Sequence, residues 1–170
     1  MSEIDDAVRA WAKGVYSVEA GAELLIRGGK AIYEGAPWLN ESTSAEGARM
    51  VSVDTDFLYL ESGAWSGSES RMTAVAVSLL AGGHLVDLND AVSGLDPERL
   101  QLVLAAIAHA AGSHEARMPI IVDNTIRGYT EPESAFPWPA PPAAVSNRSR
   151  LRSVMHDGET LGGGPAPRTP

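Results

Sequence analysis

Apolar residues recur at helical spacing through the first 28 positions of the chain, and this pattern predicts two helices. The first helix has Asp5 and Asp6 in its opening turn, where the helix dipole favours carboxylates. Its expected apolar face consists of Ile4, Val8, Trp11, Ala12 and Val15. The second helix has Ser17 as its expected N-cap and ends at Gly28-Gly29, because glycine readily adopts the left-handed conformation that closes a helix. Its expected apolar face consists of Val18, Ala22, Leu25 and Ile26.

The stretch between residues 30 and 63 mixes strand and helix signals. Ala31–Tyr33 and Met50–Val53 are short apolar runs that can pair as a β-hairpin. Asp54–Gly63 fits either a short helix capped by Asp54 or a continuation of the second strand. The sequence leaves these two alternatives open.

Two helices with clear start signals follow, over residues 69–81 and 97–111, and they are expected to form the core. Ser66-Gly67-Ser68-Glu69 is a capping box for the first of them. Asp96-Pro97 starts the second, with a capping aspartate and a proline at the first helical position. Apolar residues of the second helix are Leu100, Val103, Leu104, Ile107, Ala108 and Ala111 in one stripe, and Leu102, Ala105 and Ala106 beyond it. This helix is therefore expected to be buried on more than one side, with Leu104 fully buried.

The composition changes after about residue 115. Eight of the eleven prolines lie at or beyond Pro132, and proline lacks a backbone donor and fixes φ, which disfavours helices and central strands. One strand is predicted at Met118–Asp123, followed by an extended tail. The expected fold is mainly α, with α+β as a possibility. It comprises a compact acidic helical module with a short β-hairpin over residues 1–115 and an extended Pro/Arg-containing tail over residues 116–170.

The charge balance limits the kinds of partner. The chain carries 22 acidic and 13 basic side chains, and residues 1–115 alone have a net charge of −10. General nucleic-acid binding and membrane binding are therefore not expected. The chain has no cysteine, which excludes disulfides, thiolate metal sites and a cysteine nucleophile, and it has no apolar run of the ~18 residues that span a bilayer. These features favour a cytoplasmic protein.

Polar residues near the middle of the chain define an enzymatic alternative. The candidates are Ser66, Ser68, Asp54, Asp56 and His84. They include a nucleophile, carboxylates and a base, provided that the fold gathers them in one polar pocket. Helix capping is the favoured role of the serines and of Asp54. His109 and His114 lack the i, i+4 spacing of a helical metal site, and neither a metal nor a cofactor is predicted.

Residues 66–98 resemble one part of an ABC-type ATPase. Ser66-Gly67-Ser68-Glu69 is similar to the signature S-G-G-E, Leu85–Asp90 falls where the Walker B strand belongs, and Ser93–Glu98 matches the D-loop. The resemblance implies a strand over residues 85–90 and a nucleotide-binding ancestry. Asn89 stands in place of the magnesium-binding aspartate, Asp90 in place of the catalytic glutamate, and the Walker A motif is absent. A degenerate nucleotide-binding relative is thus a further alternative.

The favoured interpretation is a non-enzymatic interaction or regulatory protein whose partner is another protein or a second copy in a homodimer. The tail combines aromatic residues with proline, and extended proline-rich chain loses little entropy when it docks. The candidate partner-binding residues are Phe136, Trp138, Arg148, Arg150 and Arg152. Phe136 and Trp138 are expected to pack against the helical module, within the chain or across a homodimer, or onto an outside partner.

Overall fold

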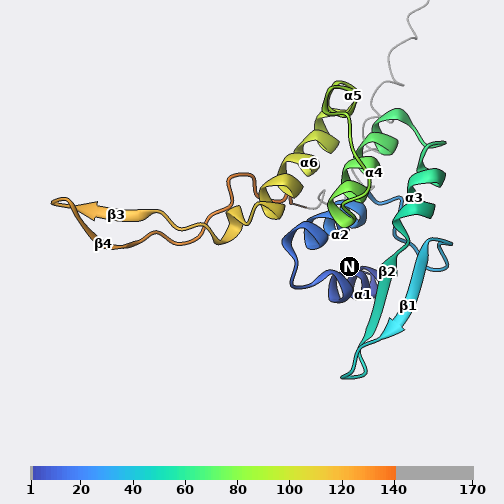
Figure 1. The fold of residues 1–170 in the computed structure, drawn as a ribbon, viewed down its shortest axis with the longest axis horizontal. Helices are drawn as coiled ribbons and strands as arrows, with labels where there is room; N and C mark the ends of the chain where they lie inside the picture. The colour runs from blue at the N-terminus through green and yellow to red at the C-terminus, as the bar shows by residue number, and fades with distance from the viewer. Residues whose placement is uncertain (1, 141–170) are drawn as a thin grey trace, which may run out of the picture. The chain divides into compact units, whose positions relative to one another are not determined.

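The computed structural model describes residues 2–140, and it begins with two helices, α1 (Glu3–Ala12) and α2 (Tyr16–Gly28), as Figure 1 shows. Ser2 caps α1, because its hydroxyl accepts the Asp5 N–H at 3.3 Å and its own N–H donates to the Asp5 carboxylate at 2.9 Å. Gly29 ends α2 in the left-handed conformation, with a φ of 71°, as the sequence predicts.

The predicted Ser17 cap of α2 is wrong. The helix begins two residues earlier, at Tyr16, and its N-cap Val15 makes no side-chain cap hydrogen bond. The turn before it is closed instead by Glu19, whose carboxylate accepts the Gly14 N–H at 2.7 Å. Gly14 has a φ of 103°, a conformation that a side chain would strain, so this glycine sets the start of the helix.

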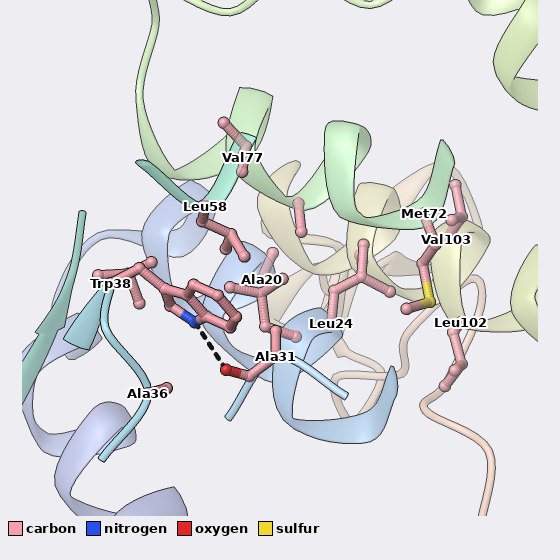
Figure 2. Close-up of a cluster of buried hydrophobic side chains, with 14 residues drawn as sticks. Ala20, Leu24, Ala31, Ala36, Trp38, Leu58, Met72, Val77, Leu102 and Val103 are labelled. Atoms are coloured by element: carbon pink, nitrogen blue, oxygen red, sulfur yellow. Dashed lines mark hydrogen bonds between the residues drawn. The ribbon is translucent and has the colours of Figure 1, made fainter. Parts of the chain in front are cut away.

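A β-hairpin follows, formed by β1 (Leu39–Thr43) and β2 (Arg49–Val53), with Leu39 opposite Val53. The prediction that Met50–Val53 is a strand is confirmed, but its predicted partner Ala31–Tyr33 is wrong. Ala31 is buried in a loop, and its carbonyl accepts the Trp38 indole N–H at 2.8 Å. That contact, which Figure 2 shows, fixes the loop against the core. The residues that pair with β2 are therefore those that follow Trp38.

Four helices follow the hairpin: α3 (Thr55–Ser62), α4 (Gly67–Leu80), α5 (Leu88–Ser93) and α6 (Pro97–Ala110). Of the two alternatives for residues 54–63, helix or strand, the structure has the helix. The Asp54 carboxylate caps it by accepting the Phe57 N–H at 3.0 Å. The capping box at Ser66–Glu69 and the Asp96-Pro97 start are confirmed. The prediction of a mainly α fold is confirmed as well, since residues 2–140 hold six α-helices and two two-stranded antiparallel sheets.

The largest cluster of buried side chains lies where α2 packs against α4 and α6. In Figure 2, Leu24, Met72 and Val103 converge there, with Trp38 and Leu58 closing the opposite side. The helices α2 and α4 approach closely at Gly21, where an added Cβ would lie 2.7 Å from Leu80 Cγ and 2.8 Å from the Ala76 carbonyl oxygen. A second, smaller cluster joins α1 to β2.

The prediction that Leu104 is fully buried is wrong, because Leu104 is only half-buried. The buried face of α6 is made of Leu102, Val103, Ala105, Ala106 and Ala108. Small alanine side chains let α6 lie close to α2, whereas Leu100, Leu104 and Ile107 of the predicted stripe lie on a more open side of the helix. Within that stripe, Ile107 is exposed.

A second hairpin lies inside the predicted extended tail, after the short helix η1 (Ser113–Glu115). Its strands are β3 (Pro119–Val122), where a strand is expected, and β4 (Thr125–Tyr129), which the sequence analysis missed. Asp123 and Asn124 form the turn, with φ values of 50° and 57°. Two consecutive left-handed residues give the type of tight turn whose twist matches that of the strands. Both hairpins and all six helices belong to one compact unit that extends to Pro139.

Candidate protein-interaction surfaces

A groove between α4, α5 and α6 is lined almost entirely by apolar side chains. Its cavity volume is about 240 Å³. We call it the α4–α6 groove, and its lining residues are Val75, Ser78, Leu79, Val86, Leu88, Ala91, Val92, Leu95, Leu100, Val103, Leu104 and Ile107. Ser78 is the one polar residue in this set, and no charged residue is part of it.

Several large side chains of the groove remain in contact with solvent. Leu88 is 69% exposed, and Val92 and Ile107 are each 47% exposed. Leu85, in the loop that leads into α5, is 91% exposed. Single exposed apolar residues are ordinary, but a contiguous group around a groove is typical of an interaction site.

Polar contacts hold α5 in place, and its large apolar side chains are not buried in doing so. Arg71 donates from Nε to the Asp90 carbonyl oxygen and from Nη2 to the Asp90 carboxylate, each at 2.9 Å. The guanidinium lies against Gly94, where an added Cβ would come within 2.3 Å of Arg71 Nε. The Asp87 carboxylate caps the helix by accepting the Asn89 N–H at 2.8 Å. Of the α5 side chains only Ala91 is buried, and Leu88 and Val92 are left exposed.

The β3–β4 hairpin is the second exposed apolar surface. We call residues 118–130 the hairpin arm, which the Thr130 N–H closes by donating to the Met118 carbonyl at 2.9 Å. Its large apolar residues are all exposed: Met118, Ile120, Ile121, Val122, Ile126 and Tyr129. Ile121 and Ile126 are cross-strand partners and share one face. Ile120 and Val122 flank Ile121 in the strand and therefore point to the other face, so both faces of the arm are apolar.

The structure places the predicted partner-binding aromatics in different surroundings. Trp138 packs against the main core cluster, and its ring lies 5.1 Å from the Arg27 guanidinium carbon. Arg27 Nη1 also donates to the Pro139 carbonyl oxygen at 2.6 Å. Phe136 is 51% exposed. The three arginines predicted with them, Arg148, Arg150 and Arg152, lie outside the described residues.

A small pocket of about 300 Å³ lies beside Trp138 and is lined by residues of α1, α2 and α6. His109 Nε2 lies 3.0 Å from the Glu19 carboxylate, and the His109 and His114 rings are stacked with centroids 4.0 Å apart. The Gly14 N–H and His109 lower the pKa of Glu19. These contacts join the end of α6 to the start of α2, so Glu19 and His109 of the pocket are already paired within the fold.

The polar residues of the enzymatic alternative form separate hydrogen-bonded groups in the structure. Ser68 Oγ donates to the Asp96 carboxylate at 2.7 Å, whereas His84 Nε2 lies 2.9 Å from Asp56 Oδ1. Within residues 2–140 no hydrogen bond joins these two pairs. Ser66 belongs to the capping box of α4 and Asp54 caps α3.

Asp96 and Glu69 have a structural electrostatic role at the starts of α6 and α4. The Arg99 N–H and the Ser68 hydroxyl lower the pKa of Asp96 to about 2. Lys30, whose Nζ lies 2.6 Å from the Glu69 carboxylate, is the main cause that lowers the pKa of Glu69 to about 2. Both carboxylates therefore stay ionised and act as helix caps and ion-pair partners.

The strand that the ABC-type resemblance implies over residues 85–90 is not present. This segment is a loop followed by the first turn of α5, which contains Asn89 and Asp90, and Asp87 is the N-cap of that helix. The similar strings at Ser66–Glu69 and Ser93–Glu98 likewise contain the N-caps of α4 and α6. Three successive capping sequences therefore account for the resemblance.

No protein-family model, curated protein or solved structure matches the chain. None of the helices in residues 2–140 is long and apolar enough to cross a membrane. The same residues contain no group of three or more histidine or acidic side chains placed to hold a metal ion. The class that the fold defines is thus a mainly helical protein with two exposed apolar surfaces, the α4–α6 groove and the hairpin arm.

Proposed function

We propose that the protein is a non-enzymatic interaction protein that binds an apolar segment of a protein partner in the α4–α6 groove. The observation that carries this proposal is the uncharged lining of the groove together with the exposure of Leu88, Val92 and Ile107. An interface core is typically depleted of charge and rich in large apolar side chains.

Covering the groove contributes favourable free energy through burial of its exposed apolar side chains. Full burial of a Leu, Val or Ile side chain contributes about 1.5–3 kcal/mol, so covering the exposed parts of Leu88, Val92 and Ile107 contributes on the order of 3 kcal/mol. This term alone does not overcome the entropic cost of association, so the partner must add contacts of its own. The groove therefore fits a partner that presents several apolar side chains at once.

The segment around Phe136 is proposed as an additional contact. Trp138 and the Arg27–Pro139 hydrogen bond fix this segment on the helices, and Phe136 remains half-exposed beside them. An exposed aromatic side chain on a fixed segment supplies a large contact area at low entropic cost.

Site-specific photo-crosslinking in the cells that produce the protein tests the proposal. A photoreactive phenylalanine analogue replaces Val92 in the groove, and the same analogue at the exposed Ser42 of β1 is the control. We expect a discrete protein adduct from position 92 that position 42 does not give, and we expect Ile107→Asp to abolish it. Absence of an adduct at position 92, or equal adducts at both positions, contradicts the proposed function.

A further inference from the structure

We infer that the occupant of the α4–α6 groove is the hairpin arm of a second copy of this chain, with the two copies exchanging arms. This inference rests on the proposed function, because it names the partner of the same groove. It is carried by the match between two surfaces that a single chain leaves uncovered.

The arm has the properties of a strand pair that is covered on both sides. A two-stranded hairpin is marginal by itself in water, and strands that are apolar on both faces are typical of buried positions. Ile121 and Ile126 supply one apolar face, and Ile120 and Val122 supply the other. None of these four side chains is buried by the helices of its own chain. The arm therefore lacks the cover that its sequence requires.

The groove supplies a complementary surface. Its lining is apolar and uncharged, so it accepts isoleucine and valine side chains without leaving a charge unpaired. The charges around the two surfaces are also complementary. Residues 117–130 include Arg117 and Arg127 against the single acid Asp123, whereas the module that carries the groove has a net charge of −10. Of the helices that line the groove, α6 has the exposed Glu98 in its first turn, whereas Asp90 in the first turn of α5 is paired with Arg71.

The exchanged contact occurs twice in a dimer. Each copy contributes the exposed side chains of its groove, Leu88, Val92 and Ile107 among them, and an apolar face of its arm. Because each copy has one arm and one groove, two-fold symmetry repeats the contact, so that each groove is covered and each arm has one of its apolar faces covered. A groove-to-groove dimer would leave the arms exposed, and an arm-to-arm dimer would leave the grooves exposed.

A complementation experiment with two variants tests the exchange. The groove variant is Ile107→Asp, with Gln101→Asp on the same helix as its control, because Gln101 is exposed and does not line the groove. The arm variant is Ile126→Asp, with Asn124→Asp in the turn as its control, because it adds an acid without altering either apolar face. Circular dichroism checks that each variant is folded. If an Asp variant does not fold, the Gln variant at the same position is used in its place.

Sedimentation equilibrium gives the dimer dissociation constant of each protein. We expect the wild type and both controls to be dimers, and each Asp variant to dimerise at least ~100-fold more weakly, because it weakens both symmetric contacts. An equimolar mixture of the two Asp variants should form a heterodimer, since the intact arm of one copy meets the intact groove of the other.

Three results overturn the inference. They are a monomeric wild type at ~100 µM, an Asp variant that still dimerises like the wild type, and two monomeric variants that do not associate when mixed. A monomeric wild type that still gives a position-92 adduct with a different protein refutes only the exchange of arms. No adduct from position 92 refutes the proposed function itself.

Discussion

Replacing Gly21 with alanine sets two physical effects of opposite sign against each other. Gly21 lies inside α2, where alanine is favoured over glycine by about 0.5–1 kcal/mol because it restricts the unfolded chain. The added Cβ, however, would lie 2.7 Å from Leu80 Cγ and 2.8 Å from the Ala76 carbonyl oxygen. Leu80 is able to change its rotamer, but the Ala76 carbonyl belongs to the backbone of α4 and does not move alone. The two helices must therefore separate, and overpacking of this kind costs about 1–3 kcal/mol.

We expect Gly21→Ala to lower the free energy of unfolding by about 1–2 kcal/mol, which corresponds to a fall of roughly 2–8 °C in Tm for a chain of this size. Chemical denaturation followed by circular dichroism measures the change. In a double-mutant cycle, Leu80→Ala should relieve part of the cost but not all of it, because the contact with the Ala76 oxygen remains. An increase in stability on Gly21→Ala would refute the close packing of α2 on α4.

Three further changes test the helix caps and the Trp138 contact. As the pH is lowered from 4.5 to about 2, the free energy of unfolding should fall. The pKa values of Glu69 and Asp96 are depressed in the folded state, so the unfolded state binds more protons over this range. Glu69→Gln should flatten this pH dependence, measured by urea denaturation. Ser66→Ala should lower the free energy of unfolding by about 0.5–2 kcal/mol whereas Ser66→Asp should preserve it, and equal losses would exclude a capping role. Trp138→Ala should cost about 1–2 kcal/mol, and the half-exposed Phe136→Ala less than about 0.5 kcal/mol, both measured by thermal melting.

Local signals in the sequence predict the starts of α4 and α6, and they offer the start of α3 as one of two alternatives. Asp54, Ser66 and Asp96 each cap a helix in the structure, because capping depends on a side chain and a backbone N–H two or three residues away. The α5 helix was missed although Asp87 precedes it, because its six residues are too short to show apolar periodicity. The helical spacing becomes visible only when the run is followed past the end of α5, through Leu88, Ala91, Val92 and Leu95, and this longer run is the signal that could have indicated the helix.

The pairing of strands that lie far apart in the sequence could not be predicted from such local signals. Met50–Val53 pairs with Leu39–Thr43 rather than with Ala31–Tyr33, because the Trp38 indole uses the Ala31 carbonyl as its acceptor. The β4 strand contains Arg127 and Gly128, which dilute its apolar pattern, and the Asp123-Asn124 turn was the signal that would have indicated a hairpin. Long-range hydrogen bonds and turn conformations thus decided the features that periodicity left open.

The position of Leu104 relative to Leu102 leads to a last prediction that separates stability from association. Leu102 is 8% exposed and belongs to the main core cluster, whereas Leu104 is half-buried and lines the groove. Leu102→Ala should therefore lower the free energy of unfolding by about 2–5 kcal/mol through lost burial and a cavity, and Leu104→Ala by about 1 kcal/mol, because Leu104 is only half-buried. For binding at the groove the order should reverse, with Leu104→Ala weakening association more than Leu102→Ala under conditions where both are folded. Denaturant midpoints and dimer dissociation constants, measured on the same two variants, supply both comparisons. If Leu104→Ala destabilises the fold as much as Leu102→Ala, then this side of α6 is part of the core, and the groove is not a surface for a partner.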